Sequence, residues 1–316
     1  ERSDDMSPHY HFIINPVAGS GHAKIVWPKL RQILQTRNIS YSFDESRYPG
    51  HTEKLCRQYA LNHPQAVIVL LGGDGTLHEA VNGLHKKTKV SATLAYIPCG
   101  SGNDFARGLS IPADPVKALD KILAAKAPRL VDIGHYTEKF RNESAFFTNN
   151  IGIGFDAQIV YLTNHSPLKK WLNKYHLGFL SYAALFFKAL KKQPTFKLEV
   201  TSPKGHQVFE QDFLCTTTNH PYFGGGVNLM PTAKINDGKL DLVVIEKKRT
   251  WPFLRLFLLM ILPGHFHIFS RRVHHLQAPK LKLAVSSAEH GQADGEEMGT
   301  KPFEISFSIN QQAFLY

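Results

Sequence analysis

Asp74 is the residue whose type and setting most clearly suggest chemistry. It lies within a glycine-rich turn, Gly72–Thr76, directly after the apolar run Val67–Leu71 and before a helix-like segment that opens at Thr76. Such turns bind phosphate, because their backbone amides and the helix N-terminus both attract anions. A carboxylate there would repel phosphate unless a metal ion or a water molecule stands between them. We therefore predict a metal-assisted phosphate site.

A second interpretation of the same turn needs no ligand. Thr76 and Glu79 have the spacing of a capping box, in which the two side chains satisfy the first amides of a helix. The turn would then join a strand to a well-capped helix without any chemistry.

Two further turns have the same order of strand, small polar residues and helix. The apolar strand His11–Asn15 runs into Pro16–Gly21 before a predicted helix at Ile25–Leu34, and the strand Ala92–Ile97 runs into Pro98–Arg107. The first turn does not have the spacing of a dinucleotide or Walker A motif and alone could be structural, and the polar residues of the second could simply cap a helix. Because parallel strands of an open α/β sheet place their carboxyl ends at one edge, we expect the three turns to converge there on one ligand.

The composition is that of a globular protein with a basic balance. The chain has 316 residues, enough for two domains, and a formal charge of +11. No acidic residue occurs in 157–198 or in 247–288, so these stretches favour contact with anionic lipid head groups or nucleic acid, or are solvated lysines. Three scattered cysteines indicate reduced thiols, and the polar first residues do not resemble a signal peptide.

The second half of the chain changes character towards β-structure. Apolar and β-branched runs separated by turn signals predict an antiparallel domain; these runs are Phe196–Thr201, Phe213–Thr218, Leu240–Ile245, Leu281–Val285 and Phe303–Ile309. Phe179–Leu190 predicts a helix that packs Phe179, Ala183, Phe187 and Leu190 on the core. Trp251–Leu262 is too short to span a bilayer and predicts a buried or interfacial helix.

Taken together, these motifs resemble the diacylglycerol kinase catalytic family and its bacterial soluble lipid kinases. The Gly-Gly-Asp-Gly core alone is shared with NAD kinases and phosphofructokinases, whereas Asn103–Arg107 narrows the resemblance to lipid kinases. The second half agrees through Asn149–Ala157, Pro221–Gly226 and the acidic triplet Asp294–Glu296. The resemblance implies an α/β nucleotide-binding domain with a parallel sheet at residues 8–132. It also implies a β-rich antiparallel, sandwich-like lipid-substrate domain at 133–316 that carries the acidic catalytic residues. Whether the C-terminal tail returns to the first domain is left open.

The resemblance also implies the site residues. Those that would contact the nucleotide are Asn15, Pro16, Val17, Ala18, Gly19, Ser46, Gly72, Gly73, Asp74, Gly75, Thr76, Leu77, His78, Glu79, Ser101, Asn103 and Asp104. The catalytic residues would be Asp74 with Asp294 and Glu296, one of the latter two taking the hydroxyl proton. A second Mg²⁺ would be held by Asp237 and the carbonyls of Lys234 and Lys239, oxygen ligands that suit a hard cation. Asn236 stands where some relatives carry a second carboxylate, which would weaken that site.

The implied activity is ATP-dependent phosphorylation of a lipid hydroxyl with Mg²⁺. Diacylglycerol is the leading acceptor, while sphingoid bases, phosphatidylglycerol or a polyprenol remain open, as do an NAD kinase-like enzyme and a non-catalytic nucleotide-binding protein. The implied setting is cytoplasmic with peripheral contact to an anionic membrane, without a nucleic-acid partner, and a homodimer is left open. Replacing Asp294 by Ala is expected to abolish transfer and leave the fold intact.

Overall fold

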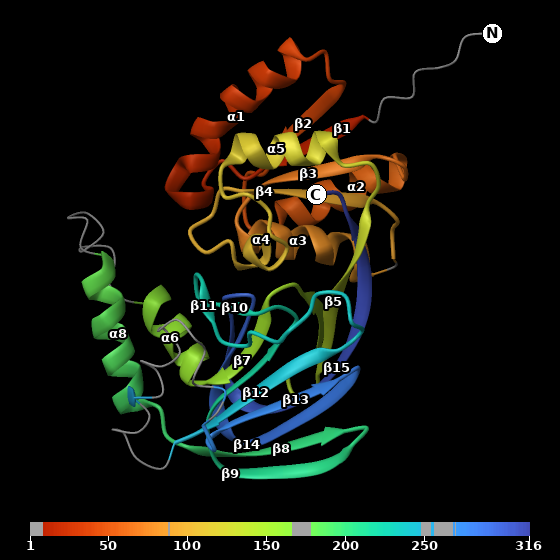
Figure 1. The fold of residues 1–316 in the computed structure, drawn as a ribbon. Coiled ribbons are helices and arrows are strands. Elements are labelled where there is room, and N and C mark those ends of the chain that lie inside the picture. Colours follow the sequence, from red (N-terminus) through yellow and green to blue (C-terminus); the bar gives the residue numbers. More distant parts are fainter. Residues whose placement is uncertain (1–8, 88, 166–177, 248–253, 256–267, 269) are drawn as a thin grey trace.

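The amino-terminal part of the chain folds as a parallel sheet covered by helices (Figure 1). The computed structural model describes residues 9–87, 89–165, 178–247, 254–255, 268 and 270–316. The sheet has the order β2-β1-β3-β4, formed by β1 (Tyr10–Ile14), β2 (Tyr41–Glu45), β3 (Val67–Gly72) and β4 (Thr93–Pro98). Every residue of β1 and β3 is buried, as expected for parallel strands with both faces covered.

Five helices accompany this sheet and connect its strands. They are α1 (Ala18–Thr36), α2 (His51–Asn62), α3 (Asp74–His85), α4 (Asp104–Gly108) and α5 (Pro115–Ala124). α1 contacts α5, and α2 packs against α3. Because α3 and α4 each begin directly after a parallel strand, their N-termini lie at the carboxyl edge of the sheet.

The rest of the chain is dominated by antiparallel strands. The strands are β5 (Arg129–Glu138), β6 (Glu143–Phe147), β7 (Asn150–Gly154), β8 (Phe196–Ser202), β9 (Gly205–Thr218), β12 (Leu240–Glu246), β13 (Val273–Ala278), β14 (Lys280–Ala293) and β15 (Glu296–Phe314). The main order is β13-β12-β9-β7-β14-β15, with β8 pairing β14 and β9, and β5 pairing β15 and β6. The short strands β10 (Tyr222–Phe223) and β11 (Val227–Asn228) form a separate hairpin.

Alternation along the strands divides this part into two cores. On β12, Leu240 and Leu242 lie in one core, which is built from side chains of the surrounding strands. Val243 and Ile245 lie on the opposite face of the strand, in a second core. That opposite face is covered by α6 (Phe155–Asn164) and α8 (Gly178–Lys192), which contact each other. Figure 1 shows both helices on the same side of the strands.

β15 joins the two parts of the molecule. It runs antiparallel to β5 and β14 along most of its length, and at its end Phe314 pairs in parallel with Leu94 of β4. Phe314 and Leu315 are buried in the amino-terminal core. The two sheets are therefore continuous through β15, and the end of the chain lies against the first domain (Figure 1).

The predicted fold class is confirmed, but several local expectations change. The capping box was wrong: α3 begins at Asp74, its N-cap Gly73 has no side-chain cap, and the Glu79 carboxylate accepts the amides of Gly50 and Thr52 instead. Glu79 therefore binds backbone amides at the start of α2, which are distant in sequence, instead of the first amides of its own helix.

α8 also departs from its predicted packing. Its side chains are described from residue 185 onward, and there Leu190 is buried as predicted while Phe187 is 58% exposed. Most of the predicted helix at Trp251–Leu262 lies outside the described residues. Among the helices in the described part of the chain, none has the length and apolar character needed to cross a bilayer. The three cysteines are buried and free of disulfides.

Candidate active site

The turns after β3 and β4 touch at the carboxyl edge of the parallel sheet. The amide of Cys99 donates to the carbonyl of Gly72 at 2.7 Å, which holds the two strand ends in register. A Cβ atom added to Gly100 would lie 2.5 Å from the Cα atom of Gly73, so the backbones approach too closely for any other residue at 100. We call these two turns, residues 72–76 and 100–105, the glycine corner.

The turn after β1 adjoins the glycine corner. The side-chain amide of Asn15 donates to the hydroxyl of Thr76 at 3.0 Å, and the predicted residues Pro16–Gly19 follow at the start of α1. Val17 is 77% exposed there. The structure thus brings together the three turns that were expected to converge.

Asp74 is the carboxylate at the centre of the glycine corner. Its two oxygens accept only long hydrogen bonds from the amides of Asp104 and Phe105, at 3.1 and 3.4 Å. Burial raises the pKa of Asp74 to about 6, the negative charge of Asp104 adds to this effect, and the two amides oppose it. The Asp74 carboxylate therefore lacks compensation in the free protein, which is the condition in which a cation binds well.

Asp104 connects the glycine corner to the second domain. One oxygen accepts from the Arg107 guanidinium at 2.6 Å, and the other accepts from the amide of Gly225 at 2.8 Å. Gly225 lies in the loop of the β10–β11 hairpin. Sequence reasoning named Asp104 as a ligand contact but missed its interdomain partner, 121 residues away, because nothing local in the sequence signals such a pair.

Other predicted nucleotide residues take structural positions around this corner. The Asn103 side chain bonds both the amide and the carbonyl of Gly100, at 3.0 and 2.8 Å, and so shapes the turn. Ser101 is exposed, while Ser46 is buried after β2 with its amide bonded to Ile14. The Glu79 carboxylate is occupied by the amides at the start of α2, and Leu77 is buried in the core.

Asp294 lies across from the glycine corner, in the turn between β14 and β15. We call Asp294–Glu296 the acid turn. One oxygen of Asp294 accepts from the amides of Asn149 and Asn150 at 2.9 and 3.0 Å. The other accepts from the amide of Thr148 and from Nδ1 of His78, both at 2.8 Å. The Asp294 side chain has no exposed surface.

These donors outweigh burial at Asp294. Burial alone would raise its pKa, but the hydrogen bond and charge of His78, together with the amides of Thr148 and Asn149, hold the pKa below its usual value. Asp294 is therefore ionised and saturated with donors, so it is poorly suited to accept a further proton. Glu296, two residues later, is exposed.

The acid turn and the glycine corner share one electrostatic environment. The charge of Asp294 contributes to the raised pKa of Asp74, and the charges of Asp294 and Glu296 both act on His78. The structure thus brings Asp74, His78 and the acid turn together. The donors Thr148–Asn150 were missed as contributors, since a residue pair about 145 positions apart leaves no local pattern.

The predicted metal-binding residues share one turn before β12. The carboxylate of Asp132 accepts the amide of Gly238 at 2.7 Å and so fixes this turn, and Asp237 accepts the amide of Lys239 at 3.1 Å. Half-buried Asp237 and backbone carbonyls are hard oxygen donors, and this donor set fits Mg²⁺. Among the described residues no group of three or more His, Cys, Asp or Glu side chains gathers as a metal cluster.

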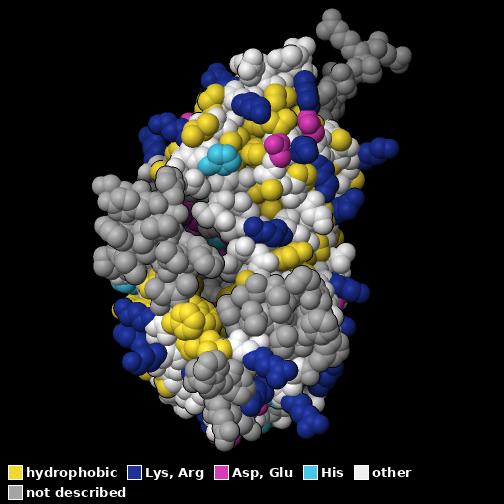
Figure 2. Space-filling view, turned by 60° about the vertical axis from the view of Figure 1, so that its left-hand side comes forward, with side chains coloured by type: hydrophobic (Ala, Val, Ile, Leu, Met, Phe, Trp, Pro, Cys, Tyr) yellow, Lys and Arg dark blue, Asp and Glu magenta, His cyan; other side chains and the backbone are white. Residues whose placement is uncertain are grey.

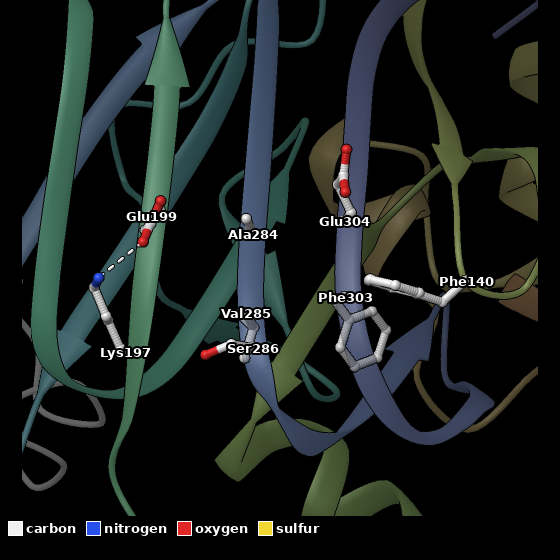
Figure 3. Close-up of a pocket in the computed structure, with 8 residues that line it drawn as sticks. All are labelled: Phe140, Lys197, Glu199, Ala284, Val285, Ser286, Phe303 and Glu304. Carbon is white, nitrogen blue, oxygen red and sulfur yellow. Dashed lines mark ion pairs between the residues drawn. The ribbon is translucent and has the colours of Figure 1, made fainter.

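A shallow pocket of about 190 Å³ lies elsewhere, on the outer face of β8, β14 and β15 (Figure 3). Its lining includes Phe303 and the ion pair of Lys197 with Glu199, at 2.9 Å. None of the predicted site residues lines it. Its one lysine, Lys197, is paired with Glu199, so the phosphate chemistry is better placed at the glycine corner.

Comparison with known proteins agrees with this geometry. Residues 9–136 match the family model described as diacylglycerol kinase catalytic domain, and residues 149–313 match the YegS C-terminal NAD kinase beta sandwich-like domain. The chain is 31% identical to YtlR of Bacillus subtilis (strain 168), covering 95% of this chain and 97% of that protein. It is also 31% identical to a diacylglycerol kinase of the same strain, with coverage of 93% and 91%.

Solved structures share the fold over the full length. A crystal structure of a diacylglycerol kinase from Bacillus anthracis str. Sterne superposes with a TM-score of 0.67 at 21% identity, covering 99% of this chain and 98% of that one. Another structure from the same organism gives a TM-score of 0.76 at 23% identity, with coverage of 100% and 98%. The chain therefore belongs to the lipid kinase family that joins a diacylglycerol kinase catalytic domain to a YegS-type C-terminal domain.

Proposed function

We propose that this protein transfers the γ-phosphoryl group of ATP to the hydroxyl of a membrane lipid, with diacylglycerol as the leading acceptor and phosphatidic acid as the product. The observation that carries the proposal is the pairing of two sites on facing parts of the molecule. The glycine corner offers backbone amides and an uncompensated carboxylate, and the acid turn offers an exposed one. Phosphoryl transfer needs both charge neutralisation and a positioned base.

Each group of site residues has its own role in the proposed phosphoryl transfer. The turns after β1, β3 and β4 bind the phosphates of ATP, and Asp74 faces the cation that accompanies them. Mg²⁺, when bound, neutralises charge on the phosphoryl oxygens; Asp237 with the carbonyls of Lys234 and Lys239 would hold a second Mg²⁺. Glu296 accepts the hydroxyl proton of the lipid, since it is exposed. Asp294 is saturated by donors and holds the turn that presents Glu296.

A direct assay tests this function. The protein is incubated with radiolabelled ATP, Mg²⁺ and a panel of lipid alcohols in mixed micelles, with NAD as a separate acceptor. We expect label in phosphatidic acid. Label in another lipid would keep the lipid kinase function and reassign the acceptor, whereas label only in NADP would overturn the proposal.

Glu296→Gln separates the catalytic role from the fold. General-base catalysis contributes roughly 10²–10⁴-fold, so turnover should fall by about that factor while the exposed side chain leaves unfolding unchanged. Glu297→Gln is the matched control, because Glu297 is the adjacent exposed carboxylate and bonds Asn164 at 2.9 Å. Equal turnover of Glu296→Gln and the wild type would remove Glu296 from the mechanism.

The setting of this reaction is a membrane surface, and we assign the contact to α8. Its exposed residues Phe187, Lys188, Lys191 and Lys192 combine an apolar ring with three cations, and no acidic residue occurs in 157–198. Figure 2 shows Lys and Arg beside a hydrophobic patch on the face that carries α8. Each cation near an anionic bilayer contributes about 1 kcal/mol to binding.

Vesicle sedimentation tests the membrane contact. Lys191→Glu with Lys192→Glu should weaken binding to vesicles containing anionic lipid and leave any binding to neutral vesicles unchanged. Lys24→Glu with Lys29→Glu makes the same charge change at exposed positions of α1. If both double variants lost binding equally, overall charge rather than α8 would mediate the contact.

A further inference from the structure

We propose that His78 is a positioning residue that holds the acid turn in register with the glycine corner, acting through the carboxylate of Asp294. This inference rests on the proposed function, because it concerns where Glu296 is presented for the reaction. It assigns to His78 a role other than contact with the nucleotide.

The position of His78 on α3 makes this role available. α3 begins at Asp74 in the glycine corner, and His78 lies one turn further along the helix. Nδ1 of His78 lies 2.8 Å from Oδ2 of Asp294, which is 216 residues away in the chain, and the His78 side chain is 13% exposed. A rigid helix thus connects the proposed phosphate site directly to the acid turn.

Asn82 binds the backbone at His78 and lies beside its ring. Its side-chain NH₂ donates to the carbonyls of His78 and Phe146, both at 2.9 Å, and its oxygen accepts the amide of Phe146 at 2.9 Å. The carbonyl partners identify the donor atom of the Asn82 side chain as nitrogen, and the amide partner identifies the other atom as oxygen. The Asp294 carboxylate can only accept a hydrogen bond, so Nδ1 of His78, which lies 2.8 Å from Oδ2 of Asp294, is the donor. The ring hydrogen then sits on Nδ1 and points at Asp294.

The other donors on Asp294 belong to its own domain. Thr148, Asn149 and Asn150 come from the connection between β6 and β7, and they would hold the carboxylate wherever the second domain lies. Among the described donors to Asp294, His78 alone comes from the amino-terminal part. Its hydrogen bond is therefore a direct contact between the acid turn and α3, the helix that begins in the glycine corner.

The charges around His78 strengthen the contact. Burial lowers its pKa, but the hydrogen bond and charge of Asp294, with smaller contributions from Glu296 and Glu79, raise the pKa above 6.5 overall. The attraction of the protonated ring is fully present below pH 6.5 and is lost as the pH rises through the folded pKa of His78. The Nδ1–H hydrogen bond remains in the neutral ring, so the register is kept on both sides of this transition.

Kinetics of His78→Phe and His78→Asn test the role. Phe keeps a ring and removes the donor, whereas the Asn side-chain NH₂ stands near the position of Nδ1. We expect His78→Phe to lower kcat about tenfold or more with KM for ATP within about twofold, since small displacements of reacting groups cost up to about 10²-fold. His78→Asn should recover most of kcat.

His85→Phe is the matched control. His85 lies on the same helix, is also buried, and its Nε2 lies 2.8 Å from the side-chain oxygen of Gln312 in β15. This variant also removes a polar contact between the two domains, but away from the acid turn. It should lower the Tm and keep kcat. An unchanged kcat in His78→Phe, or an equal loss in His85→Phe, would overturn the positioning role.

An NMR titration distinguishes failure of this inference from failure of the proposed function. In the free protein the His78 ring should titrate above pH 6.5, and Asp294→Asn should shift that titration downward. An active enzyme is not needed for this measurement. If the wild type phosphorylated no lipid, the kinase proposal would fail while the titration still decided the pairing; a His78 pKa unaffected by Asp294→Asn would overturn the inference itself.

Discussion

The glycine corner and the acid turn each hold a carboxylate that is at least half-buried, yet the protein surrounds the two in opposite ways. Asp74 receives two long hydrogen bonds and lies near the charge of Asp104, and its pKa is raised to about 6. Asp294 receives three backbone amides and His78 within 3.0 Å, and its pKa is lowered. Burial acts to raise the pKa of both carboxylates, so burial alone does not explain the difference.

What differs is the supply of donors. A carboxylate that the protein leaves uncompensated favours a cation, because the cation provides the missing charge. A carboxylate that the protein saturates has no remaining capacity for substrate or metal, and serves to fix the backbone around it. Under the proposed function, this contrast favours Asp74 as the carboxylate that binds the ligand and Asp294 as the one that fixes the backbone, although both lie in motifs that sequence comparison would equally name catalytic.

Asp294→Ala should produce the largest effect on stability. It leaves His78 and the amides of Thr148 and Asn149 without their acceptor in a buried site, and removing one partner of such a group costs about 3–5 kcal/mol. Urea unfolding measures the loss. The sequence-based expectation of an intact fold is thereby replaced by one of marked destabilisation.

Glu296→Ala is the control for Asp294→Ala, since it removes an exposed carboxylate from the same turn. Its effect on unfolding should stay within about 0.5 kcal/mol. If the two variants unfolded alike, the hydrogen bonds around Asp294 would contribute little and the contrast with Asp74 would disappear.

Asp74→Asn should have the opposite effect on stability and abolish turnover. The folded pKa of about 6 lies above the usual value of 3.8, so ionisation opposes folding: the stability present below pH 3.8 is lost as the pH rises through 6. In protein treated with EDTA, the amide should therefore stabilise the fold above pH 6 by about 1–3 kcal/mol and have little effect near pH 4. Thermal unfolding at both pH values measures this, and a variant less stable than the wild type at pH 7.5 would contradict it.

The sequence predicted the glycine corner better than the acid turn. Short apolar runs followed by glycine identified β1, β3 and β4, and the shared carboxyl edge of parallel strands predicted that the turns carrying Asn15 and Thr76 would come together. This inference needs no knowledge of side-chain contacts, because the topology of a parallel sheet alone brings the strand ends together.

The missed features are those decided by contacts distant in sequence. Glu79 had a plausible local partner in Thr76, but the amides of Gly50 and Thr52 bind it in the folded chain. Phe187 fits a helical apolar face, yet the core beneath α8 is filled by other residues and leaves it exposed. The strands β14 and β15 extend well beyond their apolar runs, since pairing with each other supports polar residues that carry no strand signal.

Asp156→Asn separates the effect of an uncompensated charge from the effect of catalysis. Asp156 is buried at the start of α6; Gln292 and Thr216 bond one of its oxygens at 3.1 and 3.3 Å, and burial raises its pKa to about 6, as at Asp74. Above pH 6 the amide should therefore stabilise the protein by about 1–3 kcal/mol, by the same sign of linkage. Turnover should change little, because the described contact of Asp156 with the acid turn is indirect, through Gln292, whose oxygen accepts the amide of Gly295. Thermal unfolding and kcat, measured on both variants, decide whether Asp74 and Asp156 differ in function. If Asp156→Asn lost turnover as completely as Asp74→Asn, an uncompensated charge would not by itself identify the site that binds the cation.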